Sequence, residues 1–174
     1  MNLAAYHAES NRAMPNASFH RSSAGVKQAH ADRLKRRVDE VYEMSVRLTS
    51  ANCRYQVLET LKQLREEAVE LASELSRHAA AENQVWLMHL AHGPSLRQDA
   101  AGLRAIRDLE REHVLALDFI GTFLEQSDLE LYLLDSGKAG HDYAKNERLK
   151  HLSDNLTQAC LILKARFSEE EALV

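Results

Sequence analysis

The chain has 174 residues, of which 45% are hydrophobic and 28% are charged, and this composition fits one globular domain with a sizeable core. Its 22 Lys and Arg against 26 Asp and Glu give a net charge of −4, so no basic excess points to nucleic acid as a partner. No apolar run has the length of a signal peptide or a membrane span, and the two cysteines lie far apart. We therefore expect a soluble cytoplasmic protein with reduced thiols.

Helix-breaking residues are sparse, with 6 Gly and 2 Pro in the whole chain, which predicts an all-α protein with long helices. Residues 1–24 are rich in Ser, Asn and Ala and are expected to form a flexible N-terminal segment, followed by one folded domain over 25–174. The first helix is predicted over about 25–50, because apolar residues recur at steps of three and four. Its core positions are Leu34, Val38, Val41, Met44 or Ser45, and Leu48.

The second helix is predicted over about 54–91 and ends where Gly93 and Pro94 follow it. The same spacing that places apolar residues on one face also places His78 and Glu82 there. The full stripe is Leu61, Leu64, Ala68, Leu71, Leu75, His78, Glu82, Val85, His89 and His92.

The third helix is predicted over about 96–126 with Ser95 as its N-cap, and residues 129–134 are expected to add a turn or a short helix. Its stripe is Leu103, Ile106, Glu110, His113, Leu117, Ile120 and Leu124. The fourth helix is predicted from about 141 to the end of the sequence, with a stripe of Leu149, Leu152, Leu156, Ala159, Leu163, Arg166, Glu170 and Leu173. Four long helices with short connections predict an up-down-up-down four-helix bundle.

Ionisable residues recur on the predicted core faces, and such groups need a partner or a metal ion when they are buried. His78 and Glu82 are four residues apart, so both side chains can reach one ion from the same helix face. A set of imidazole and carboxylate ligands suits iron, manganese or zinc better than magnesium or calcium.

The chain resembles the hemerythrin-like family of HHE cation-binding proteins over about residues 25–174. The resemblance rests on His30, on His78-Ala79-Ala80-Ala81-Glu82, on Glu112-His113, and on the Arg166 to Glu170 segment. It implies a four-helix bundle with a di-iron centre that binds or senses oxygen, nitric oxide or redox state, or handles iron. It further implies that His30, His78 and His113 are terminal ligands and that Glu82 and Glu170 are bridging carboxylates.

Arg166 occupies a position where the family pattern has another histidine. A guanidinium stays protonated and has no lone pair to donate, so Arg166 is expected to be a non-ligating cation beside Glu82 or Glu170. Glu110 lies three residues before His113 and is a possible further ligand. The expected content is therefore one or two non-haem iron ions, or none.

Two functions follow from these patterns. The first is a cytosolic iron-binding protein whose partners are the metal ion and a diatomic gas. The second is a metal-free bundle with a His, Glu and Arg core network that acts as a regulatory or interaction module, similar to anti-sigma-factor regulators. The sequence has no Gly-rich phosphate loop or nucleophile elbow, so turnover is not indicated. A homodimer, through apolar residues such as Phe119 and Phe123, or another protein partner is also expected.

Overall fold

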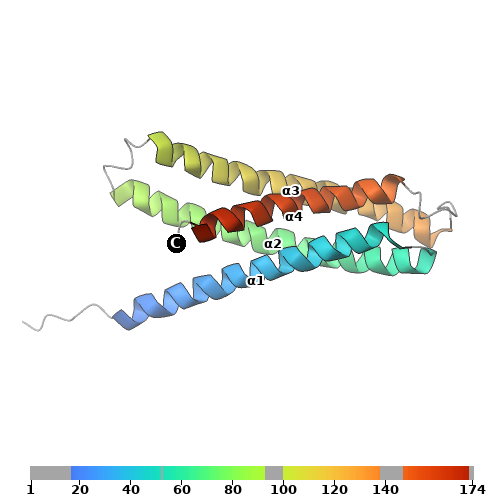
Figure 1. Cartoon of the computed structure of the whole chain (residues 1–174), viewed down its shortest axis with the longest axis horizontal. Helices are drawn as coiled ribbons and strands as arrows, with labels where there is room; N and C mark the ends of the chain where they lie inside the picture. The colour runs from blue at the N-terminus through green and yellow to red at the C-terminus, as the bar shows by residue number, and fades with distance from the viewer. Residues whose placement is uncertain (1–16, 52, 93–99, 138–146, 173–174) are drawn as a thin grey trace, which may run out of the picture.

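The computed structural model describes residues 17–51, 53–92, 100–137 and 147–172, and these residues form four α-helices. The helices are α1 (Ala17–Thr49), α2 (Arg54–His92), α3 (Ala100–Asp135) and α4 (Glu147–Ala172). Consecutive helices run in opposite directions, and the described residues include no strand (Figure 1). Each helix packs against two others: α1 and α3 both contact α2 and α4. The predicted up-down-up-down bundle is confirmed.

In α1, α2 and α4, the apolar positions of the predicted stripes are buried wherever the structure describes their side chains. In α3 the prediction is wrong in part, because Ala116 and Phe123 are buried whereas Leu117 and Leu124 are only partly buried. In α2, the five apolar positions from Leu61 to Leu75 are all fully buried. In α4, the stripe from Leu149 to Arg166 is buried throughout. In α1, Leu34, Val38, Val41 and Leu48 are buried, and Ser45 is buried while Met44 only packs against the edge of the core. Burying these side chains is the main favourable term for the fold.

Ser45 can occupy the core because two helices satisfy its hydroxyl group. Its Oγ donates to the carbonyl of Tyr42 at 2.8 Å and lies 3.1 Å from Oγ1 of Thr157 in α4. Ser153 of α4 donates in turn to the carbonyl of Ser45 at 2.5 Å. These small polar side chains therefore join α1 to α4 without leaving a buried hydroxyl unsatisfied.

Two helix boundaries differ from the predictions, and the predicted start of the fourth helix at about 141 lies outside the described residues. The first helix begins at Ala17, so the predicted N-terminal segment is helical over its last eight positions, 17–24. The third helix is continuous to Asp135, which makes the predicted separate turn at 129–134 part of α3. The reason is that residues 122–135 contain neither Gly nor Pro to end the helix. The fourth helix begins at Glu147, and residues 138–146 and Ser95 lie outside the described residues.

Two interactions satisfy carbonyl groups at the C-terminus of α3. Gly137 follows α3 with a φ of 72°, and its amide donates to the carbonyl of Leu134 at 3.3 Å. Arg54, at the start of α2, donates from Nη2 to the carbonyl of Leu134 and, at 3.0 Å, to that of Asp135. Carbonyls that the helix itself cannot satisfy at its C-terminus thus find donors in the turn and in α2.

Within the described residues, no helix is long and apolar enough to cross a membrane. Cys53 is exposed and Cys160 is buried, and neither forms a disulfide. Phe123 is fully buried in the core, so the idea that it supports a dimer from outside the core is wrong; Phe119 is only partly buried. Phe123 takes a core position because α3 contacts both α2 and α4, which widens its buried face.

Candidate metal centre

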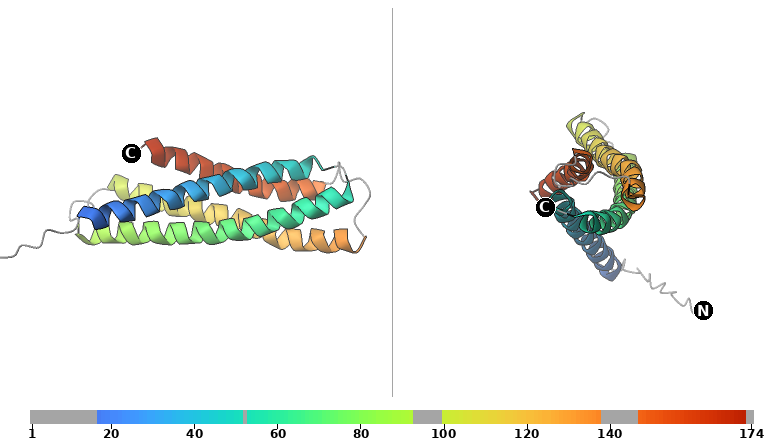
Figure 2. Two further views of the ribbon diagram at one scale, coloured as in Figure 1. Left: turned by 90° about the horizontal axis from the view of Figure 1, so that it is seen from below. Right: turned by 90° about the vertical axis from the view of Figure 1, so that its right-hand side faces the viewer.

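The candidate site lies between α2 and α3, near the end of the bundle where α2 and α4 finish and α1 and α3 begin (Figures 1 and 2). His78 and Glu82 are one helical turn apart on α2, and Nε2 of His78 lies 3.3 Å from Oε1 of Glu82. His113 of α3 faces the same carboxylate, with its Nε2 at 3.8 Å from Oε2. Two neighbouring helices therefore supply two imidazoles and one carboxylate to one point.

The three side chains offer ligand atoms that all lie within 4.8 Å of one another. Among the described residues, they form the one group of three or more such side chains with this spacing. The rings of His78 and His113 are 5.8 Å apart between centroids and lie edge to face. Both Nε2 atoms are buried, and neither has a hydrogen-bond partner within the described part of the chain. Two buried imidazole nitrogens beside one carboxylate, without aligned hydrogen bonds, fit a cation between them.

Arg166 of α4 completes the polar cluster, as predicted, as a non-ligating neighbour. Its side chain is 1% exposed, and Nη2 donates to Oε2 of Glu82 at 2.9 Å. Its Nη1 lies 3.8 Å from Oε2 of Glu112 in α3. The guanidinium is therefore placed between two carboxylates, one in the site and one at its edge.

The protonation equilibria of the site follow from burial and from these charges. Burial and, after it, the positive Arg166 together lower the pKa of His113 from 6.5 to about 4, although Glu82 opposes the shift. Burial alone would raise the pKa of Glu82, but His78, Arg166 and His113 together outweigh that effect and lower it. At neutral pH, His113 is thus an uncharged imidazole with a lone pair, and Glu82 is an anion.

The remaining predicted ligands are not part of this group of three. His30 of α1 is half-buried, and its ring centroid lies 6.0 Å from that of His78. Helix α1 leans away from the bundle toward its N-terminus (Figures 1 and 2). His30 lies at the edge of the site, half-buried and outside the group whose ligand atoms converge. Glu110 is exposed, and the side chain of Glu170 lies outside the described residues. The structure therefore brings together three of the five predicted ligands.

Glu112 belongs to the cluster although the sequence pattern favours Glu110. The spacing of three residues places Glu110 on the stripe of His113, and Glu112 is expected to point away. In the structure, the carboxylate of Glu112 faces Arg166 across the α3 and α4 interface. Arg166 is the residue of the sequence from which this contact could have been predicted, because a buried guanidinium needs acidic partners.

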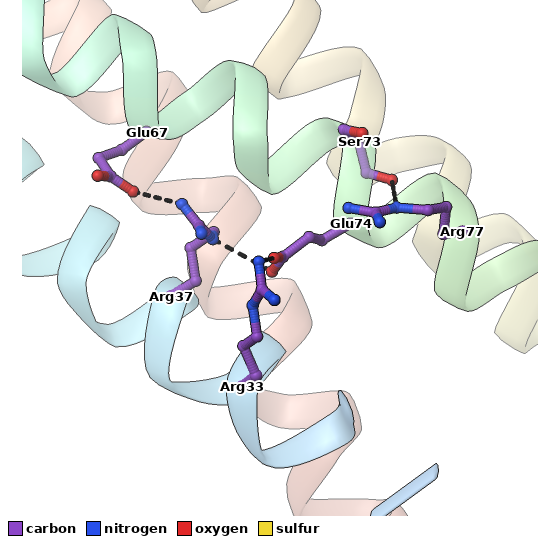
Figure 3. A network of polar contacts seen from close by, with 6 residues as sticks. All are labelled: Arg33, Arg37, Glu67, Ser73, Glu74 and Arg77. Carbon is purple, nitrogen blue, oxygen red and sulfur yellow. Dashed lines mark hydrogen bonds and ion pairs between the residues drawn. The ribbon is translucent and has the colours of Figure 1, made fainter. Parts of the chain in front are cut away.

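A second polar cluster adjoins the site and was not predicted. Glu74 of α2 is 1% exposed and lies one turn before His78; its Oε1 forms an ion pair with Arg33 at 2.5 Å, and its Oε2 accepts a hydrogen bond from Nε of Arg37 at 3.1 Å (Figure 3). Arg37 also pairs with Glu67 at 2.6 Å. These ion pairs join α1 to α2, with Arg33 three residues after His30 and Glu74 four residues before His78, so they help to fix the helix spacing on which the site depends.

Comparisons with known proteins identify no relative of this chain. No family model, no curated protein and no solved structure matches the chain. The similarity to hemerythrin-like proteins therefore rests on the residues quoted above, and the function is argued from the site itself.

Proposed function

We propose that this protein binds one divalent transition-metal ion through His78, Glu82 and His113. The observation that supports the proposal is the convergence of three ligand atoms within 4.8 Å, from two helices, with both imidazole Nε2 atoms buried and without hydrogen-bond partners. Metal ligands in helical bundles are placed in the same way, on facing helices in the core.

Non-haem iron is the ion that we propose first. Two histidines and one carboxylate on one side of an ion are typical of non-haem Fe(II) sites that keep open coordination positions, and zinc accepts the same donors. His113 is uncharged at neutral pH because of its low pKa, so metal binding there displaces no proton from it. A bound iron would supply open positions for a diatomic ligand, which agrees with a role in oxygen, nitric oxide or redox sensing, or in iron handling.

One ion rather than two is proposed because of Arg166. A second ion beside Glu82 would lie next to a fixed guanidinium, which is already 2.9 Å from the Glu82 carboxylate. The two unbonded cysteines agree with a reducing compartment, and we propose the cytoplasm as the location.

The test is metal content after loading with Fe(II) without oxygen, or with Zn(II), followed by removal of excess ion. Elemental analysis should give one ion per chain, and His78→Ala, Glu82→Ala and His113→Ala should each weaken binding about tenfold or more. His151→Ala is the matched control, because His151 is an exposed histidine of α4 far from the site. A metal-free wild type after loading, or equal binding by all four variants, would refute the proposal.

A metal-free regulatory or interaction module is the second candidate function. The observation that favours it is the ion pair between Arg166 and Glu82, which already neutralises the partly buried carboxylate of Glu82. On this hypothesis the cluster is a structural network, and the bundle acts through its surface. The same variants then change only the free energy of unfolding, and the wild type takes up no metal.

A further inference from the structure

A cleft of about 320 Å³ lies between α3 and α4 at the other end of the bundle. It is lined by Gln126, Leu129, Glu130, Glu147, Arg148, His151 and Leu152. Seventeen residues of α3 separate Glu130 from His113, which corresponds to about 25 Å along the helix axis. The cleft is therefore distinct from the candidate metal centre.

The walls of the cleft have the mixed character of small-molecule sites. Leu129 and Leu152 line it from opposite helices, and most of its surface is apolar. Such sites combine apolar walls with a few fixed polar groups, and their volumes begin at about 300 Å³. Asn155 of α4 holds two of the polar groups in place, since its Nδ2 lies 3.3 Å from Oε1 of Gln126 and 3.4 Å from Nδ1 of His151.

Glu130 is the unusual residue of the cleft. Its side chain is 4% exposed, and only one of its oxygens is paired, with Oε1 at 2.9 Å from Nε of Arg148. The other oxygen, Oε2, is buried and has no hydrogen-bond partner among the residues that the structure describes. Burial raises the pKa of this carboxyl, and Arg148 offsets part of the rise. A buried carboxylate oxygen without a donor is costly, so a ligand that supplies a donor gains more here than at an exposed acid.

The charges around the cleft decide which kind of donor fits. Among the described residues that line the cleft, Glu130 and Glu147 contribute two negative charges and Arg148 contributes one positive charge, which gives these residues a net charge of −1. An anionic ligand would meet the Glu130 carboxylate unfavourably, and a neutral apolar ligand would leave Oε2 unsatisfied. A monocation with an N–H donor neutralises the negative charge and also supplies the hydrogen bond that Oε2 of Glu130 lacks.

We propose that the cleft between α3 and α4 binds a small organic cation, an alkylammonium or arylalkylammonium whose amine contacts Glu130 and whose apolar body lies between Leu129 and Leu152. The ammonium donates a hydrogen bond to Oε2 of Glu130, whereas Arg148 pairs with Oε1 of the same carboxylate. This site goes beyond the proposed metal function, and neither depends on the other.

The experiment compares three probes of similar shape by chemical-shift titration of ¹⁵N-labelled full-length protein. The probes are 2-phenylethylammonium, neutral 2-phenylethanol and anionic 3-phenylpropanoate. The cation should bind most tightly, and its shifts should cluster at residues 126–130 and 147–152. Shifts scattered over the bundle, no saturable shifts at millimolar probe, or equal affinity for the three probes would overturn the proposal.

A pair of variants assigns the effect to the buried carboxylate. Glu130→Gln keeps the shape of the side chain and should lower the affinity for 2-phenylethylammonium about tenfold or more, because a charge-assisted hydrogen bond is lost. Glu125→Gln is the matched control, since it removes the same charge from an exposed position of α3 and should leave the affinity unchanged. Equal affinity of Glu130→Gln and wild type for 2-phenylethylammonium would contradict the assignment. If Glu130→Gln folds poorly, the comparison of the three probes on the wild type still tests the proposal.

Discussion

Glu82 is the residue on which the candidate site depends, because its two carboxylate oxygens have three ionisable neighbours. Oε1 faces His78, whereas Oε2 faces both His113 at 3.8 Å and the Arg166 guanidinium at 2.9 Å. A carboxylate can accept from several donors at once, so Arg166 and a metal ion can share it. They are nevertheless both cations, and each weakens the attraction of the carboxylate for the other.

Replacing Arg166 by methionine should therefore change metal affinity and stability in opposite directions. Removing the nearby positive charge should raise the affinity for Zn(II) about tenfold. Without metal, the same change leaves Glu82 unpaired by a cation and should lower the free energy of unfolding by about 2 kcal/mol, because Glu82 is only partly buried. Competition with a chromophoric chelator measures the first effect, and urea unfolding in EDTA measures the second.

The control for this variant is Arg65→Met, which also breaks an ion pair between two helices, in this case α2 and α3. Arg65 pairs with Asp128 at 2.8 Å, and both side chains are substantially exposed. The cost should stay below about 1 kcal/mol, and metal affinity should not change. Weaker metal binding by Arg166→Met would mean that Arg166 orients Glu82 for the ion instead of competing with it.

His113 should make the metal-free protein less stable in mild acid. The unfolded chain takes up a proton on this residue near its ordinary pKa of 6.5, whereas the folded protein does so only at about 4. Since the unfolded state binds more protons between these values, stability falls as pH decreases from about 6.5 to about 4, by on the order of 2 kcal/mol. The lowered pKa of Glu82 adds a further loss only below its ordinary value of 4.5.

Urea unfolding in EDTA at several pH values between 7.5 and 4.5 measures this dependence. His113→Gln removes the titrating group and should flatten the profile above pH 4.5, whereas His151→Gln, at an exposed position, should keep the wild-type slope. A profile of His113→Gln that follows the wild type would show that another group causes the loss.

At the scale of the helices, the apolar spacing predicted the buried faces but not the helix ends. The stripe of α2 from Leu61 to Leu75 and that of α4 from Leu149 to Arg166 are buried as expected. The end of α3 at Asp135 could not be predicted from spacing, because the polar run from Glu125 to Asp128 looks like a loop until the bundle packs against the residues after it. Tertiary packing extends helices beyond what local sequence supports.

Two glycines of the α3 region should respond to alanine with opposite signs. Gly121 is inside α3, and a methyl group there would meet nothing within 4 Å, so Gly121→Ala should stabilise the fold by about 0.5 to 1 kcal/mol. Gly137 has a positive φ, and Gly137→Ala should destabilise it by about 1 kcal/mol. Chemical denaturation of both variants checks the signs; destabilisation by Gly121→Ala would show that α3 is not a regular helix at that point.

At the scale of the whole molecule, the bundle was predictable from periodicity, whereas the candidate site was predictable only in part. His78, Glu82 and His113 could be found because polar residues interrupted regular apolar stripes. The position of His30 at the edge depends on how far α1 leans from the bundle, which no local pattern encodes. The buried Glu74 was missed for a related reason, since it flanks the stripe and is covered only because Arg33 and Arg37 reach it from α1.

Metal binding should stabilise the whole bundle, because the ligands come from two helices that separate on unfolding. An ion that binds only the folded state raises its free energy of unfolding by about 2.7 kcal/mol at a free concentration one hundred times the dissociation constant. Thermal unfolding followed by circular dichroism should therefore shift upward with Fe(II) in the absence of oxygen, or with Zn(II), and EDTA should reverse the shift. Magnesium should have no such effect, since it prefers a shell of oxygen ligands.

Two variants distinguish stabilisation by metal binding at the candidate site from stabilisation by unspecific binding of metal to surface carboxylates. The combined His78→Ala, Glu82→Ala and His113→Ala variant should lose the shift, because only the folded wild type gathers these three ligands within reach of one ion. His151→Ala should keep the whole shift. If the combined variant were stabilised as much as the wild type, the ion would be bound elsewhere, and the Arg166 and Glu82 pair would be left as a structural network in a metal-free bundle.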